Sequence, residues 1–129
     1  MKDKFKIAHD NYSSAISNQD YDDSIGELGD LISQDIEVTT CLTLRSHLYS
    51  LSGDINQAIS DLDRAIELIP NSGSLYYSRG DLHRKDKGYY LSLRDLVEAV
   101  RLAQSKGDDD LIDAAEHIFI EIFEKMRSQ

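Results

Sequence analysis

A block of residues recurs at a spacing of 34 along this chain, and this period constrains the fold more than any other feature. The middle copy contains Gly53, Ala58, Leu62, Ala65 and Pro70. One period later stand Lys87, Ser92, Leu96, Ala99 and Gln104, and one period earlier Gln19, Ser24, Leu28, Leu31 and Ile36. Small and apolar residues therefore persist at matching positions. A period of this length is typical of stacked helical hairpins, none of which buries its apolar face alone.

Each period contains two stretches in which apolar residues have helical spacing, with a short polar turn between them. In the middle copy Gly53 interrupts the first stretch, and Asp54 is expected to cap the second, with Gln57 three residues later. The segment from Pro70 to Gly73 is expected to stop that second helix, since proline cannot continue a helix and glycine frees the backbone.

The whole pattern predicts an all-α protein of seven helices in a single domain, residues 1–129, with no strand alternation. Three helical hairpins are expected at about residues 5–38, 39–72 and 73–106, followed by a capping helix at about 108–127, whose opening aspartates suit the positive end of a helix. The small side chains of Ala58, Ala65 and Ala99 are expected to let the paired helices approach closely, with Gly80 serving the same purpose from the opposite helix.

The net charge of −10 argues against binding to nucleic acid, which depends on lysine and arginine contacts to phosphates. Residues 73–106 are the exception, because basic residues outnumber acidic ones there. Arg84, Lys85 and Lys87 form a local basic patch within this segment. It is interpreted either as a solvated hairpin tip or as a docking point for an acidic segment.

No stretch approaches the ~18–20 apolar residues of a membrane helix, and the first residues lack the apolar run of a secretory signal. Cys41 is the only cysteine, which excludes an internal disulfide and suits a reducing compartment. We therefore predict a cytoplasmic protein that does not bind a membrane.

Neither a metal site nor a catalytic site is expected. His9, His47, His83 and His117 fall on different predicted helices, without the helical spacing that places metal ligands on one face. The chain also lacks a glycine-rich phosphate loop and a nucleophile elbow. We predict no enzymatic activity and no cofactor.

Two arginine–aspartate pairs are predicted within the hairpins. Arg45 and Asp61 stand eight residues on either side of Gly53, and Arg79 and Asp95 flank Lys87 in the same way. Residues equidistant from the turn of an antiparallel hairpin lie at similar heights, so each pair can face across its own two helices. Such a pair is either a solvated contact that contributes ~0–1 kcal/mol to stability, or a buried pair in which removal of one partner has a larger effect on stability.

At these positions the chain resembles the tetratricopeptide-repeat family. The best match runs from Leu42 to Asn71, LTLRSHLYSLSGDINQAISDLDRAIELIPN, with Tyr49, the turn at Gly53, Ala58, Ala65 and Pro70 at the family's positions. The next copy supplies Tyr76, Gly80, Tyr89, Leu96 and Ala99. The family's tryptophan position holds Leu42 or Tyr76 here, and only one repeat keeps its proline.

The resemblance implies a right-handed superhelix whose concave surface, formed by the first helix of each hairpin, holds a peptide or helix of a partner protein. Leu44, His47, Leu51, Tyr77 and Asp81 are expected to line that groove, although Tyr77 could instead pack between repeats. One subclass of the family grips acidic carboxyl-terminal tails with lysine and asparagine. The matching positions here are His9, Ser13, Leu44, Ser74 and Ser78, so this carboxylate clamp is not expected.

The last predicted helix has a wider apolar face than capping requires. Ile112, Phe119 and Phe123 are candidates for a dimer contact or a partner site. The leading interpretation is an adaptor or scaffold that binds a protein segment in its groove. The alternatives are a unit that self-associates through its last helix and a chaperone-like protein that holds a cargo.

Overall fold

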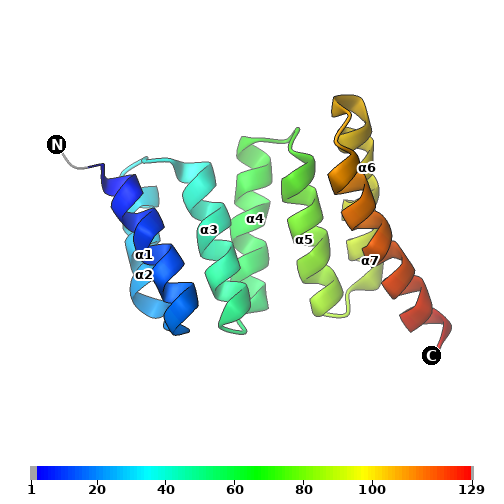
Figure 1. The fold of residues 1–129 in the computed structure, drawn as a ribbon, viewed down its shortest axis with the longest axis horizontal. Coiled ribbons are helices and arrows are strands. Elements are labelled where there is room, and N and C mark those ends of the chain that lie inside the picture. Colours follow the sequence, from blue (N-terminus) through cyan, green and yellow to red (C-terminus); the bar gives the residue numbers. More distant parts are fainter. Residues whose placement is uncertain (1–2, 129) are drawn as a thin grey trace. The chain divides into compact units, whose positions relative to one another are not determined.

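The computed structural model describes residues 3–128, which contain seven α-helices and no strand. The helices follow one another with short connections (Figure 1). They are α1 (Lys4–Asn18), α2 (Asp22–Ser33), α3 (Val38–Leu51), α4 (Ile55–Leu68), α5 (Gly73–Lys85), α6 (Tyr89–Lys106) and α7 (Asp109–Arg127). The predicted all-α fold class and its capping helix are therefore confirmed.

The chain divides into two compact units, Met1–Leu68 and Ile69–Gln129. In the first unit α1 packs against α2, α2 against α3, and α3 against α4. In the second unit α5 packs against α6, and α7 packs against both of them. The single domain predicted for residues 1–129 remains a prediction.

Side-chain caps set several helix starts. Oδ1 of Asp54 accepts a hydrogen bond from the Gln57 amide at 3.4 Å, as the sequence pattern predicted. Oδ1 of Asp108 accepts one from the Leu111 amide at 3.1 Å and opens α7. Each cap satisfies a backbone donor that has no partner within its helix.

The segment after α4 differs from expectation at Gly73. The helix stops at Leu68, just before Pro70, but Gly73 is the first residue of α5 and Ser72 is its N-cap. A β-carbon on Gly73 would lie 2.9 Å from Cδ2 of Leu111 and 3.1 Å from the carbonyl oxygen of Ala99. Glycine is needed here for close packing against α6 and α7, and not to end a helix.

The small residues at matching positions are buried, as predicted. Ala58, Ala65 and Ala99 have no exposed surface. A β-carbon added to Gly80 would lie 3.2 Å from Cγ of Leu96, so α5 and α6 approach closely at this glycine. A leucine recurs at one position of all three repeats and is also buried each time, as Leu28, Leu62 and Leu96. The period of 34 thus places equivalent residues in equivalent core sites.

The turn between paired helices requires left-handed backbone at one repeat position. Gln19, Gly53 and Lys87 occupy this position, with φ of 54°, 88° and 61°. Only glycine adopts this conformation without a steric cost, which for other L-residues is roughly 1–2 kcal/mol. Glutamine and lysine therefore destabilise the first and third turns.

We predict that Lys87→Gly and Gln19→Gly each raise the free energy of unfolding by about 0.5–1 kcal/mol, because relief of strain exceeds the entropy that glycine adds to the unfolded chain. Urea denaturation measures the change. Gly53→Ala is the matched control and should lower stability by about 1 kcal/mol. Destabilisation by Lys87→Gly would show that its turn carries no strain.

Candidate protein-interaction surfaces

Both predicted arginine–aspartate pairs are present, one in each unit. Nε and NH2 of Arg45 donate to the two carboxylate oxygens of Asp61 at 2.9 and 2.7 Å. Nε and NH2 of Arg79 reach Asp95 at 2.8 Å each. Both aspartates are buried, at 5% and 6% exposure, and the hydrogen bonds to Asp61 raise the pKa of Arg45. These two-point contacts hold the helices of a hairpin together.

In the first unit, an aromatic row crosses from α1 to α3. Phe5, His9, Tyr12 and His47 follow one another with ring centroids 6.0, 5.9 and 6.0 Å apart. The Tyr12 hydroxyl lies 2.6 Å from Nδ1 of His47, and burial raises the pKa of Tyr12. His47 was predicted as a groove residue, whereas Phe5 and Tyr12 of α1 were not among the residues named for the groove.

Leu44 and Leu51 of α3 are the other groove residues predicted in this unit. Leu51 is 43% exposed, His47 is exposed, and Leu44 is half-buried. Together with the aromatic row they form the first-helix surface of this unit. It combines aliphatic, aromatic and hydrogen-bonding groups at exposed or half-buried positions.

In the second unit, Tyr77 of α5 packs against the core that α6 and α7 share. That core is formed by Leu96, Ala115, Ile118 and Ile122. Burial and then the neighbouring Asp81 raise the pKa of Tyr77. Tyr77 is half-buried, so its ring contributes to packing and its exposed part remains on the surface of α5.

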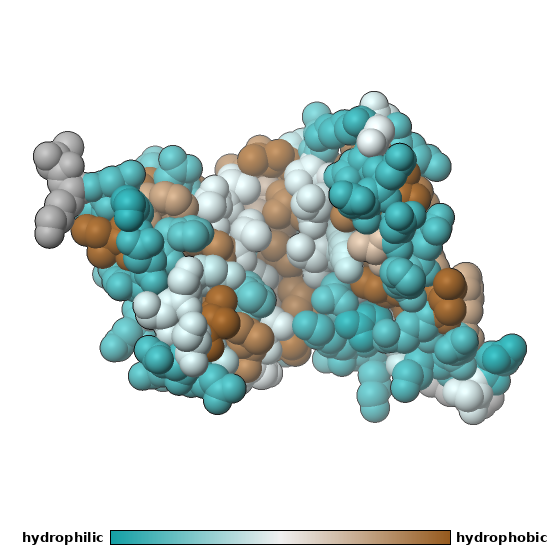
Figure 2. Space-filling model, viewed as in Figure 1, coloured by the Kyte–Doolittle hydropathy of each residue, from teal (hydrophilic) through white to brown (hydrophobic). Residues whose placement is uncertain are grey.

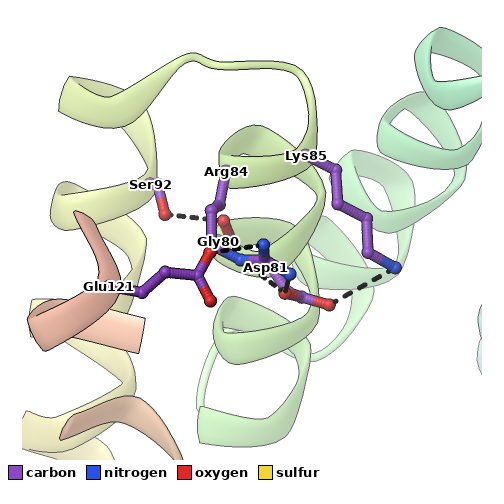
Figure 3. A network of polar contacts seen from close by, with 6 residues as sticks. All are labelled: Gly80, Asp81, Arg84, Lys85, Ser92 and Glu121. Atoms are coloured by element: carbon purple, nitrogen blue, oxygen red, sulfur yellow. Dashed lines mark hydrogen bonds and ion pairs between the residues drawn. The ribbon is translucent and has the colours of Figure 1, made fainter. Parts of the chain in front are cut away.

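A polar network joins α5 to α7 (Figure 3). Arg84 donates to Asp81 on its own helix and, at 2.7 Å, to Glu121 of α7. Nζ of Lys85 lies 3.7 Å from the other carboxylate oxygen of Asp81. Burial opposes the charge of Arg84, but the hydrogen bond to Asp81 leaves its pKa raised.

This network changes the interpretation of the basic patch. Two of its three members, Arg84 and Lys85, lie against acids of their own unit, whereas Lys87 is exposed in the strained turn. The long-range partner Glu121 stands 37 residues from Arg84, and no sequence spacing indicated it. The patch therefore presents less uncompensated positive charge than the sequence suggested.

The exposed apolar side chains of α7 differ from the expected set. Phe123 is 58% exposed, but Phe119 packs against the core and Ile112 is half-buried. Ile120 and Met126, at 58% and 47% exposure, take their place. Hydrophobic surface alternates with hydrophilic surface along the C-terminal half of this helix (Figure 2). The difference arises because the docking of α7 decides which side of a broadly apolar helix is covered.

Among residues 3–128, no three histidine, cysteine, aspartate or glutamate side chains come together as metal ligands. His83 instead places Nε2 at 3.7 Å from Asp95, beside the arginine pair. Cys41 is buried and free, and burial followed by the charge of Glu37 raises its pKa. Within the described residues no helix has both the length and the apolar character to cross a bilayer.

Comparison with known proteins identifies the fold. No family model matches the sequence. A curated relative, the bovine protein SGT1 homolog, is 25% identical over 97 residues; the match covers 75% of this chain but only 29% of that protein. The chain thus spans less than a third of this relative.

Three solved structures share the arrangement of the helices. The TPR2AB domain of yeast Sti1 in a pHSP90 complex has a TM-score of 0.82 at 17% identity, over 92% of this chain and 46% of that one. PcrH in complex with the chaperone-binding region of PopB has a TM-score of 0.79 at 13% identity, over 91% of this chain and 95% of that one. The Sgt2 TPR domain of Aspergillus fumigatus has a TM-score of 0.77 at 18% identity, over 95% of this chain and 81% of that one. The chain therefore has the fold of tetratricopeptide-repeat domains.

Proposed function

We propose that this chain is a protein-interaction module that binds a peptide or helix of a partner protein on the first-helix surface formed by α1 and α3. The part of the groove expected on α5, at Tyr77 and Asp81, remains a prediction. The main support is the fold, because two structures with the same fold, from yeast Sti1 and PcrH, were solved in complexes with partners. The first-helix surface on α1 and α3 adds support, since it exposes aromatic and aliphatic groups together.

The partner segment should be of mixed apolar character and not an acidic tail. Of the five clamp positions, His9, Ser13, Leu44, Ser74 and Ser78, none is lysine, arginine or asparagine. A carboxylate group therefore finds no permanent positive charge at these positions. Leu51 and His47 instead favour an aliphatic or aromatic side chain. The cytoplasmic placement remains a prediction.

Peptides selected from a random display library test this function. We predict that the paired substitution His47→Asp and Leu51→Asp weakens a selected peptide at least about tenfold in calorimetry, because it places two carboxylates on the apolar contact surface. Leu68→Asp, at a 52% exposed leucine near the end of α4, is the matched control and should leave affinity unchanged. The proposal would be contradicted if both variants lost peptide affinity equally. It would also be contradicted if neither variant changed the affinity of the selected peptides.

Self-association through α7 is a second candidate function, favoured by a stripe of exposed residues. Glu116, Ile120, Phe123 and Arg127 are spaced by four, three and four residues, so they lie along one side of the helix. All four are exposed. The stripe is acidic at one end, apolar in the middle and basic at the other end.

Such a stripe is complementary to itself in an antiparallel arrangement. A two-fold axis at residues 121–122 would bring Ile120 against Phe123 of a second copy and Glu116 against its Arg127. Two-fold contacts need this self-complementarity, and helices paired in this way bury an apolar seam between charged pairs.

Charge exchange tests this second function. We predict that Glu116→Arg and Arg127→Glu each weaken a dimer measured by sedimentation equilibrium, by about threefold to tenfold, because each places like charges opposite one another. The double variant should restore it, since the charges are then exchanged and complementary again. A wild-type chain that stays monomeric at high concentration, or a double variant no better than the singles, would contradict self-association through this stripe.

A further inference from the structure

The first hairpin lacks a cation that the other two hairpins contain. Arg45 binds Asp61 and Arg79 binds Asp95, and one period earlier the equivalent residues are Asn11 and Glu27. The Asn11 amide donates to the two Glu27 oxygens at 3.0 and 3.3 Å. It thus reproduces the contact across the hairpin but supplies no positive charge.

A pocket of about 350 Å³ lies at this place, between α1 and α2. It is lined by Asn11, Ser14, Ala15, Asn18, Asp20, Asp23, Ser24 and Glu27. Shorter side chains help to create it: asparagine replaces arginine at Asn11, and Ser14 stands where Leu48 and Leu82 fill the core of the later repeats. The pocket thus lies beside positions at which the later repeats carry longer side chains.

The charge of this pocket is unbalanced. Three of its lining residues, Asp20, Asp23 and Glu27, carry carboxylates, and none is basic. Lys4 and Lys6 of α1 are engaged elsewhere, with Gln34 and Asp10.

A second observation points to a missing ligand. Ser24 lines the pocket with 4% exposure, and among residues 3–128 its Oγ is the buried side-chain polar atom without a hydrogen-bond partner. Its counterpart Ser92, two periods later, donates to the Gly80 carbonyl at 2.7 Å (Figure 3). Buried hydroxyl groups are normally satisfied, so Ser24 is a polar residue at the wall of the pocket whose hydroxyl the chain itself leaves without a partner.

We propose that the pocket receives an arginine side chain of a partner polypeptide, with its guanidinium group on Glu27. The later repeats show the contact that the pocket is shaped for, a planar two-point pair of arginine with a carboxylate. Guanidinium has five N–H donors and no acceptor, which matches a lining of carboxylates and a free serine oxygen. A lysine ammonium group offers no equivalent planar pair.

This site lies on α1 and α2 and is independent of the first-helix surface proposed to bind a peptide. A partner that places an arginine here would extend the repeat pattern from outside, since its guanidinium group would occupy the position that Arg45 and Arg79 occupy within the chain. The two sites can therefore be tested separately.

Titration with N-acetyl-arginine amide, followed by ¹⁵N NMR, tests the proposal. Saturable shifts at amides of residues 11–27 are expected, together with little effect from the neutral isostere N-acetyl-citrulline amide and a weaker effect from N-acetyl-lysine amide. Glu27→Gln should weaken arginine binding about tenfold, because it removes the charge of the two-point pair. Asp30→Asn, the same charge change elsewhere on α2, is the matched control and should leave binding nearly unchanged.

Asn11→Arg gives a second measurement. Its side chain should occupy the pocket, pair with Glu27, raise the thermal midpoint and abolish binding of the probe. The gain in thermal midpoint should disappear when Glu27→Gln is added. Equal binding of arginine and lysine would reduce the pocket to a general cation site, and no saturable shifts with arginine would also overturn the proposal.

Discussion

Replacing Asp61 with alanine should lower the free energy of unfolding by about 3–5 kcal/mol, the usual cost of removing one partner from a buried ion pair. Asp61 is 5% exposed and accepts two hydrogen bonds from Arg45. Without the carboxylate, the Arg45 guanidinium group loses its counter-ion between α3 and α4. Because 21% of the Arg45 side chain reaches solvent, water recovers part of the loss, and a value near the lower end is expected.

Chemical denaturation of three variants separates this effect from general loss of charge. Asp10→Ala removes the acid of the exposed Lys6–Asp10 pair and should cost no more than ~0.5 kcal/mol. Replacing Arg45 and Asp61 together with methionine and leucine should recover most of the stability lost in Asp61→Ala, since an apolar pair leaves no uncompensated charge. An Asp61→Ala variant as stable as the parent would show that the pair is effectively solvated.

Truncation of Leu96 to alanine is expected to cost about 2–5 kcal/mol, the range for core leucines whose removal leaves a cavity. Leu96 has no exposed surface. It lies where Gly80 lets α5 approach α6, and it belongs to the core that holds α7. Truncation of Leu96 should therefore loosen the packing of α5 against α6 and the packing of α7 on the core of the second unit.

Val97→Ala is the matched control for this truncation. Val97 is the next residue of α6 and is 59% exposed, so its truncation should change stability by less than ~0.5 kcal/mol. Amide hydrogen exchange adds a local readout. Leu96→Ala should lower protection in α7 as well as in α6, and unchanged protection in α7 would show that the capping helix is held without this core.

The period of 34 was sufficient to predict the helices, the hairpins and the buried small residues, because each of these depends on local spacing. The arginine–aspartate pairs could be predicted for the same reason, since the symmetry of a hairpin about its turn fixes which residues face each other. The left-handed conformation at Gln19 and Lys87 could also have been inferred, because both align with Gly53.

Contacts between different hairpins could not be predicted in this way. The aromatic row from Phe5 to His47 depends on how two hairpins pack, and the Arg84–Glu121 contact depends on how the capping helix packs on the third hairpin. No spacing within one hairpin encodes either contact. The exchange of Phe119 for Ile120 on the exposed side of α7 has the same origin. A helix that is apolar over a wide face can dock in several rotations, and only its neighbours choose among them.

Mapping a selected peptide onto the chain by ¹⁵N chemical-shift perturbation tests the central claim most directly. We predict that the perturbed amides cluster on the exposed faces of α1 and α3, with the largest shifts near His47 and Leu51. Perturbations confined to the second helices, α2, α4 and α6, or to α7 alone, would contradict a function that depends on the first-helix surface of α1 and α3.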